Sequence, residues 1–270
     1  MKEKVWVNIP LNYLEVLRDW SQFFAYESED EENGKLVVYE FTTNTKEYCN
    51  FDQFLKENTI KHYIFRRVYT FTKREKDNAE ILWLWTDDDA KESYTPELIN
   101  HVCDACGKKI PHLDRHLLHV DYKKIKKYDI MSTYHGDTET IVSEKIKHLF
   151  NQEGITGVEF EPIYQIGKEN QVIEGFYHLI LREGIGDVVE PSEIIKKDYC
   201  PVCGFYDDFR CKTTLNFKRN TWKGLDICYT KNWFGGPPKF KSLIISNKLY
   251  RVLEQNKIKH VYFQPAYLID

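Results

Sequence analysis

The clearest pattern along the chain is a helix-type spacing of apolar residues followed by a strand-type alternation, and it occurs twice. In residues 141–164 and again in 244–267, apolar side chains first recur at i, i+3 and i+4, which places them on one face of a helix. Apolar and polar positions then alternate, which places one row of side chains on one face of a strand. The helical positions are Ile146, Leu149 and Phe150 in the first stretch and Leu249, Val252 and Leu253 in the second; the alternating positions are Val158, Phe160, Pro162 and Tyr164, and Val261, Phe263, Pro265 and Tyr267.

Local signals predict where these elements begin and end. Ser143 and Ser246 stand where an N-cap side chain accepts a hydrogen bond from the first free amides of a helix. Gly154 suits the left-handed residue that closes a helix. Because proline cannot donate to a sheet ladder, Pro162 and Pro265 predict a bulge or a sheet edge at that end of their strands.

The two stretches also match residue by residue. Without a gap, nine of the 24 positions in 141–164 and 244–267 are identical, where average amino-acid usage gives roughly one or two. A weaker third copy occupies 54–69, and Phe51, Phe54 and Leu55 at its start again have the helix-type spacing. The sequence therefore predicts an internally repeated unit of strand, helix, strand and strand.

The remaining strong segments complete an α+β prediction. An amphipathic helix is expected from Tyr13 to Tyr26, because apolar residues recur at Leu14, Leu17, Phe23 and Phe24. Stretches rich in β-branched and aromatic residues predict strands at 36–41, 80–85, 176–181 and 242–245. The predicted fold consists of repeated helix-plus-strand units packed on antiparallel or mixed sheets. The expected domains are an N-terminal α+β region, 1–98, which carries the weak copy, and a domain at 99–270 with the two strong copies.

Composition places the chain among ordinary globular proteins. It has 270 residues, 42% of them hydrophobic, which is enough for one large or two modest cores. The first twenty residues lack the apolar stretch of a secretory signal, and the longest apolar run, residues 81–85, is far shorter than a membrane span. We therefore expect a cytoplasmic protein, where a reducing environment favours metal-binding or redox cysteines over disulfides.

Charge argues against a nucleic-acid partner. The net charge is −4, so the chain as a whole is not suited to neutralising phosphates. The charge is uneven, with acidic runs at 27–32 and 87–89 and a short basic run at 123–127. Such runs are typical of solvated loops and surfaces. The alternative interpretation of the acidic runs is a docking surface for a basic protein partner.

The candidate chemistry is concentrated in two pentapeptides, CDACG at 103–107 and CPVCG at 200–204. Each Cys-x-x-Cys supplies two thiolates on a tight turn, and the following glycine can adopt the positive φ that turns backbone amides toward sulphur. Closing the loop between the motifs costs about 4 kcal/mol, whereas a structural zinc contributes on the order of 10 to 16 kcal/mol. The sequence therefore predicts one zinc-ribbon-like structural zinc site held by Cys103, Cys106, Cys200 and Cys203.

Several alternatives stay open at this point. His112, His116 and His119 have helical spacing and could bring an imidazole to the first pair, and Cys211 could replace a ligand near the second. A redox CxxC would follow a strand and open a helix, which neither motif does. A catalytic zinc would need an open coordination position and a nearby carboxylate, but the sequence has no His-x-Glu and no His-Glu-x-x-His. No catalytic constellation is evident, and we expect no enzymatic activity.

The order of motifs resembles a known family. CDACG, a helix and strand ending VEFEP, CPVCG, and a helix and strand ending VYFQP resemble the double-CxxCG immunity proteins of bacterial polymorphic toxin systems. The resemblance covers roughly residues 100–270. It departs from the family in that the first motif has no proline after its first cysteine and about 100 residues precede it.

The resemblance implies a protein that binds and neutralises a cognate toxin by protein–protein contact, without catalysis and with the four cysteines as structural metal ligands. The alternative is a zinc-ribbon nucleic-acid-binding or regulatory protein that uses Arg66, Arg67 and the lysines at 123–127. A third possibility, a metalloenzyme, requires solvent or substrate in place of one protein ligand on the metal.

Overall fold

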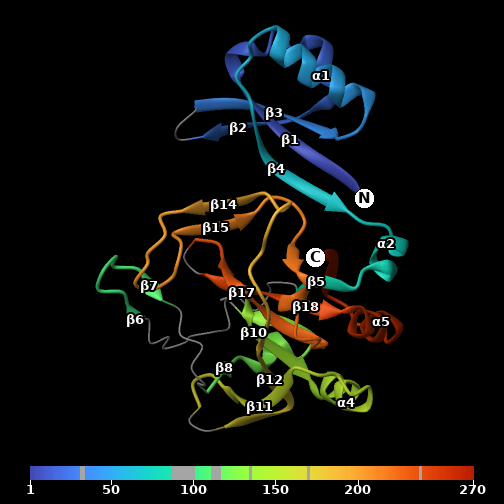
Figure 1. Ribbon diagram of the computed structural model, residues 1–270, viewed down its shortest axis with the longest axis vertical. Helices are drawn as coiled ribbons and strands as arrows, with labels where there is room; N and C mark the ends of the chain where they lie inside the picture. The colour runs from blue at the N-terminus through green and yellow to red at the C-terminus, as the bar shows by residue number, and fades with distance from the viewer. Residues whose placement is uncertain (31–33, 87–100, 111–116, 134–135, 169–170, 237–238) are drawn as a thin grey trace. The chain divides into compact units, whose positions relative to one another are not determined.

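A computed structural model describes residues 1–30, 34–86, 101–110, 117–133, 136–168, 171–236 and 239–270. The chain folds into two compact units, Met1–Thr72 and Lys73–Asp270, called unit 1 and unit 2 below (Figure 1). The boundary expected at residues 98 and 99 lies outside the described residues. Strand β5, which the expected N-terminal region includes, belongs to unit 2 because it is hydrogen-bonded between two strands of that unit. The fold is mixed α+β, as predicted, and it consists mostly of sheets with few helices.

Unit 1 is an antiparallel sheet of four strands in the order β2-β3-β1-β4, with one helix packed on it. Side chains of β1, β3 and α1 form its core, in which Phe51 of the helix stacks on Phe41 of the sheet with ring centroids 4.4 Å apart. Its elements are β1 Lys2–Pro10, β2 Phe24–Asp30, β3 Gly34–Thr42, α1 Lys46–Glu57, β4 Tyr63–Thr70 and the 3-10 helices Leu11–Tyr13 and Arg18–Phe23.

The amphipathic helix expected over 13–26 is wrong. The segment forms the short 3-10 helix Arg18–Phe23 and then enters strand β2. Trp20 and Phe23 pack on the rings of Phe51 and Phe41, with centroids 4.9 and 4.6 Å apart. The apolar residues of this segment therefore cover the aromatic core without forming an α-helix. Tertiary packing outweighs the local preference for a helix.

Unit 2 contains two larger sheets. One has five strands in the order β8-β11-β12-β10-β9, and the other has six in the order β13-β17-β18-β5-β19-β16. Neighbouring strands are antiparallel except for the short edge strands β8, β13 and β16, which are parallel to their neighbours. The five strands are β8 His119–Val120, β9 Ile130–Thr133, β10 Gly136–Ser143, β11 Val158–Gln165 and β12 Val172–Leu181; the six are β5 Ile81–Thr86, β13 Glu183–Ile185, β16 Asn216–Lys218, β17 Ile227–Phe234, β18 Phe240–Ser246 and β19 Val261–Ile269.

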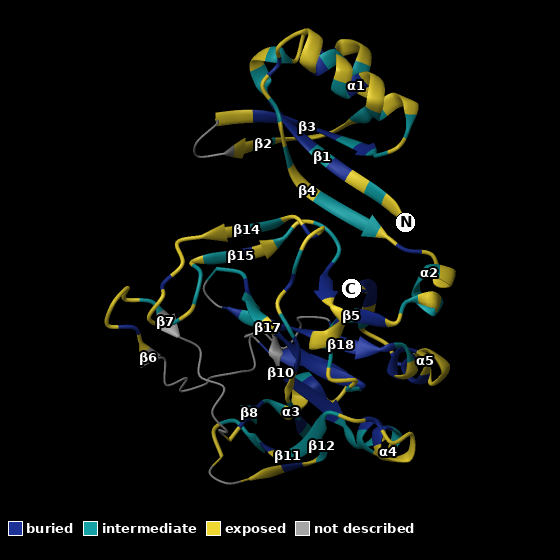
Figure 2. Ribbon diagram, in the orientation of Figure 1, coloured by how far each residue is buried: buried dark blue, intermediate teal, exposed yellow. Residues whose placement is uncertain are grey.

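The main core of unit 2 joins both sheets and the two longer helices. Buried side chains of β5, β10, β12, β17 and β18 pack with Ile146 and Phe150 of α4 and with Leu249 and Leu253 of α5. Figure 2 shows the resulting band of buried residues in β5, β10 and β18, while α4 and α5 keep exposed outer faces. The helices of this unit are α2 Lys73–Asn78, α3 Tyr122–Ile125, α4 Glu144–Gln152, α5 Asn247–Gln255 and the 3-10 helix Arg219–Thr221.

Two small hairpins complete unit 2. One pairs β6 His101–Val102 with β7 Lys109–Ile110, and the other pairs β14 Ile194–Lys197 with β15 Asp208–Cys211. The second hairpin belongs to a separate core on the six-stranded sheet, in which Phe209 of β15 packs with Phe217 and Ile244. Among the residues that the structure describes, none of the helices combines the length and the apolar character that a membrane span needs.

The strand predictions and the helix-type spacings are confirmed. The expected strands at 36–41, 80–85, 176–181 and 242–245 lie in β3, β5, β12 and β18, and the three helix-type spacings lie in α1, α4 and α5. Pro162 also lies beside a bulge in the pairing of β11 with β12, as its missing donor predicts.

The three strand–helix–strand segments share one topology. In β10–α4–β11 the two strands are separated by β12, in β18–α5–β19 by β5, and in β3–α1–β4 by β1. Each inserted strand is antiparallel to both neighbours, so the flanking strands are parallel to each other, which is a split β-α-β arrangement. The inserted strand follows its segment only in the first case; β5 and β1 precede theirs.

The two helices of unit 2 begin with the same set of contacts. Ser143 and Ser246 occupy the N-cap positions, and each donates its backbone N–H, at 2.9 Å, to the carbonyl of an aspartate, Asp129 and Asp226 respectively. The serine hydroxyls donate to the carboxylates of the same aspartates, at 3.0 and 2.7 Å. The predicted capping hydrogen bond forms only in α5, where Leu249 N–H donates to Ser246 Oγ; Ser143 makes none.

Helices α1, α4 and α5 end with the same backbone conformation. Thr59, Gly154 and Lys257 occupy aligned positions and have positive φ, at 55°, 58° and 53°. The residue after each donates its N–H to a carbonyl five residues back, with N···O distances of 2.9, 2.9 and 3.1 Å. The left-handed closure predicted for Gly154 is therefore present, and two non-glycine residues adopt the same conformation.

Because glycine occupies this left-handed position in α4 and lysine occupies it in α5, exchanges at the two positions should have opposite effects on stability. Lys257→Gly should raise the free energy of unfolding by about 1 kcal/mol, because glycine adopts positive φ without the steric cost of a Cβ. Gly154→Ala should lower it by a similar amount, although a Cβ there meets no neighbouring atom within 4 Å. Urea unfolding of both variants measures this, and equal signs for the two exchanges would contradict it.

Candidate metal centre

Each CxxCG motif forms the tip of a hairpin. CDACG connects β6 to β7, and CPVCG lies in the connection from β14 to β15. A two-cysteine turn between antiparallel strands is the building block of zinc ribbons, and two such hairpins supply the four ligands of one site. The sequence forms these tips locally, because each glycine stands where the chain must turn back with positive φ, +68° at Gly107 and +74° at Gly204.

The two turns, called knuckle 1 (103–108) and knuckle 2 (200–205) below, have the same backbone hydrogen bonds. In knuckle 1, Gly107 N–H donates to the Cys103 carbonyl at 2.7 Å, and Cys103 N–H donates to the Lys108 carbonyl at 2.9 Å. In knuckle 2, Gly204 donates to Cys200 at 2.8 Å and Cys200 to Phe205 at 2.9 Å. This shared geometry fixes the direction of both cysteine side chains in each turn.

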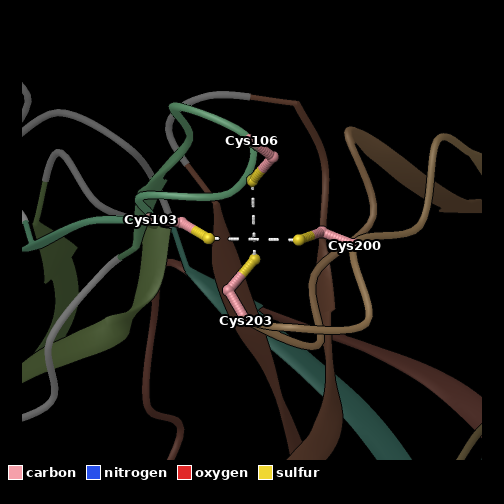
Figure 3. Close-up of side chains that lie close together, drawn as sticks. All are labelled: Cys103, Cys106, Cys200 and Cys203. Atoms are coloured by element: carbon pink, nitrogen blue, oxygen red, sulfur yellow. Dashed lines mark hydrogen bonds between the residues drawn. The ribbon is translucent and has the colours of Figure 1, made fainter.

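The four sulphur atoms converge on one point, although 97 residues separate the first cysteines of the motifs (Figure 3). Sγ of Cys103 lies 3.9 Å from that of Cys200, and Sγ of Cys106 lies 3.8 Å from that of Cys203. All four lie within 4.8 Å of one another. A tetrahedron with metal–sulphur distances of about 2.3 Å has sulphur–sulphur edges of about 3.8 Å, so the cluster has the size that a tetrahedral thiolate-bound metal requires.

The pKa values of the clustered cysteine thiols are shifted in different directions. Backbone N–H groups of Cys203 and Val202 donate to the Cys200 sulphur and lower its pKa to about 6. Loss of water raises the pKa of Cys106 to about 12 and also raises that of Cys203. Four sulphur atoms at this separation cannot all ionise together without a cation, and a divalent metal at their centre removes that cost because its ligands are thiolates.

Two lysines next to the cluster supply further positive charge. Lys108 follows knuckle 1, and its ammonium group donates to the Asp198 carbonyl at 2.6 Å and pairs with the Asp207 carboxylate at 2.9 Å. Its pKa is raised, first by the hydrogen bond to Asp207. Because Asp198 and Asp207 flank knuckle 2, Lys108 links the two knuckles independently of a metal.

Lys239 is the more unusual of the two because it is only 7% exposed. Its ammonium group donates to the carbonyls of Tyr206, Asp207 and Gly235, the last two at 3.1 and 3.3 Å. Burial lowers its pKa, and the charge of the nearby Asp207 carboxylate acts most strongly in the opposite direction. A buried ammonium group near Cys203 would offset part of the negative charge of a metal-bound thiolate cluster.

The other predicted ligands lie elsewhere. Cys211 lies at the end of β15, and its thiol donates to the Thr213 carbonyl at 3.3 Å, so it is not among the clustered cysteines. His119 lies in strand β8 with Nδ1 at 3.0 Å from the Leu117 carbonyl, so the helical spacing proposed for the three histidines is wrong at its last member. His112 and His116 lie outside the described residues. Within the described ranges, no other cysteine, histidine, aspartate or glutamate joins the four.

Sequence reasoning missed both lysines. Lys108 carries a weak signal, because it directly follows the glycine of knuckle 1. Lys239 carries none, because it is 35 residues from Gly204 and reaches knuckle 2 only through the fold.

Comparison with known proteins adds no family to this site. No protein-family model matches the chain, and no curated protein matches it either.

Proposed function

We propose that Cys103, Cys106, Cys200 and Cys203 hold one structural zinc ion. Four thiolates in a tetrahedron are the usual donor set of structural zinc, which has no preference for a planar or octahedral arrangement. A complete set of four protein ligands leaves no position for substrate or activated water. Bound there, zinc ties two hairpins from distant parts of unit 2 into one rigid element.

On this basis the protein acts in the cytoplasm as an immunity protein, which binds a cognate toxin and neutralises it by protein–protein contact. The observation that carries this proposal is the single four-sulphur centre. The resemblance to double-CxxCG immunity proteins depends on the two motifs acting together, and their convergence supports it. A closed metal site in a sheet-rich scaffold also suits a binding protein better than an enzyme.

The same proposal includes internal duplication of the strand–helix–strand segments. Three features support it: the shared strand order, the Asp–Ser contacts at the starts of α4 and α5, and the positive φ at all three helix ends. Repeated units with different surface side chains give a scaffold whose binding faces can vary while its cores stay alike.

No structural observation favours the nucleic-acid alternative. Arg67 pairs with Glu3 at 3.0 Å, and the Arg66 guanidinium lies over the Trp6 ring, 5.1 Å from its centroid. Both arginines thus already have partners within unit 1. Their engagement gives no support to a role in phosphate contact.

Co-purification tests the proposed function directly. The tagged chain, expressed together with the product of each adjacent reading frame, should form a 1:1 complex with one of them, and that product should be toxic without it. Binding should persist after nuclease treatment. If none of these products binds, and the purified chain instead binds DNA or RNA with strong salt dependence, the nucleic-acid alternative replaces the proposal.

A further inference from the structure

A cavity of about 480 Å³ opens beside knuckle 2 in unit 2. Its lining includes the aromatic rings of Tyr199, Tyr206 and Trp233 and two lysines, Lys196 and Lys231. None of these side chains is a metal ligand. The size is typical of a pocket that takes a ligand or an anchoring side chain.

Knuckle 2 holds one wall of this cavity in place. Tyr199 precedes Cys200, and Phe205 and Tyr206 follow Gly204, so the wall is formed by the residues on either side of the metal turn. The rings of Tyr199 and Tyr206 lie 4.9 Å apart, and those of Phe205 and Trp233 lie 5.6 Å apart. Large side chains that are already held in position lose little entropy when a partner packs on them.

The charges around the cavity do not cancel. Lys231 pairs with Asp187 at 2.8 Å, and Asn232 donates to the other oxygen of the same carboxylate at 2.9 Å. Lys196 is different: its ammonium group lies over the rings of Tyr206 and Phe209, at 5.7 and 5.9 Å, and no ion pair in the described part of the chain includes it. Among the described residues, the lining of the cavity therefore keeps one positive charge without an ion-pair partner, on a chain whose net charge is −4.

Apolar surface continues from the cavity onto the tip of knuckle 2. Val202 is 71% exposed and Tyr199 is 55% exposed, both unusually high for large hydrophobic side chains. A small molecule inside the cavity would leave this surface uncovered, whereas a protein segment would cover both. Aromatic anchors in a pocket, surrounded by contacts that exclude water, are the usual composition of a protein-binding hot spot.

We propose that this cavity is the docking site for an acidic segment of the partner protein. A carboxylate of that segment pairs with Lys196, and a neighbouring aromatic or aliphatic side chain packs on Tyr199 and Trp233. The inference rests on the proposed function, because the partner is the toxin, and it adds which face of unit 2 binds and what chemistry that face selects.

The test compares three variants of the full chain for binding to the co-purifying partner by isothermal titration calorimetry. Lys196→Met, which removes the charge but keeps the apolar stem, should weaken binding by about fivefold, and Lys196→Glu by more than tenfold. Tyr199→Ala should weaken it by about tenfold or more, because it removes an anchoring ring.

Lys197→Glu is the matched control. Lys197 is the next residue in β14, also exposed, and its side chain projects to the opposite face of the hairpin and does not line the cavity. It changes the net charge as Lys196→Glu does and should leave the affinity within about twofold. Metal content and thermal unfolding of every variant should match the parent chain.

The outcomes separate the two proposals. Loss of affinity in the Lys196 and Tyr199 variants but not in Lys197→Glu supports the docking site. Equal affinity in all of them, with tight binding by the parent chain, overturns the docking site and leaves the immunity function intact. Failure of the parent chain to bind any adjacent product overturns the function and, with it, this site.

Discussion

Cys106→Ser should yield a protein with less than one equivalent of zinc and a free energy of unfolding lower by about 4 kcal/mol. Cys106 suits this test because its residue is exposed while its sulphur lies in the cluster, so serine removes a ligand with little loss of packing. The expected loss is a part of the roughly 10 to 16 kcal/mol that a structural zinc contributes, because three of the four thiolates remain.

The measurements are metal analysis of the purified protein and guanidinium unfolding followed by circular dichroism. Removal of zinc from the parent chain by a strong chelator should reproduce the loss. Cys49→Ser and Cys211→Ser are the matched controls, since neither sulphur belongs to the cluster, and both variants should keep one zinc. A Cys106→Ser protein as stable as its parent, or loss of zinc in Cys211→Ser, would contradict the ligand set.

The parts of the fold that the sequence predicts are those with local causes. The amphipathic spacing of α4 and α5, the positive φ at Gly154 and the glycine after each cysteine pair all act within one turn of the chain. The meeting of the two CxxCG motifs has a different basis, because they are far apart in the sequence. It can be predicted because the energy of binding one metal ion exceeds the entropy cost of closing the loop between the motifs.

The order of strands within the sheets cannot be predicted from local sequence patterns. β5 follows β4 in sequence, yet it is hydrogen-bonded between β18 and β19, more than 150 residues further along. Its β-branched and aromatic residues show that it is a strand and nothing about its neighbours, because any apolar strand of suitable length satisfies the same ladder. The reason for the placement is tertiary: Ile81, Leu82 and Leu84 are all buried, so β5 requires cores on both faces.

The charged residues around the four cysteines are likewise brought there by the tertiary structure. Lys239 donates to carbonyls 33 and 32 residues earlier in the chain, and Asp207 pairs with Lys108 of the other hairpin. In the sequence they are ordinary charged residues. Their role follows only from the burial of one ammonium group and its distance to three carbonyl oxygens.

The contacts of Asp226 connect the β10–α4–β11 segment to the β18–α5–β19 segment. Its side chain is nearly buried and accepts hydrogen bonds from Thr156, which precedes β11, and from Ser246 and Lys248 at the start of α5. The distances lie between 2.7 and 3.3 Å. Burial alone would raise the pKa of Asp226, but the hydrogen bonds from Ser246 and Thr156 and the charge of Lys248 outweigh it and hold the pKa below its ordinary value.

Asp226→Ala should therefore lower the free energy of unfolding by about 3 kcal/mol, because it leaves several buried donors without an acceptor. Asp129→Ala, at the start of α4, is the matched control and should cost about 1 kcal/mol, since that carboxylate is 29% exposed against 11% for Asp226 and has fewer partners.

The depressed pKa of Asp226 sets the sign of the pH dependence: the Asp226 contribution to stability is present in full above about pH 4 and is lost as the pH falls below it. Urea unfolding at several pH values should thus show the gap between the parent chain and Asp226→Asn closing as the pH falls below about 4. A gap that stays constant would mean that the carboxylate charge does not hold the two segments together.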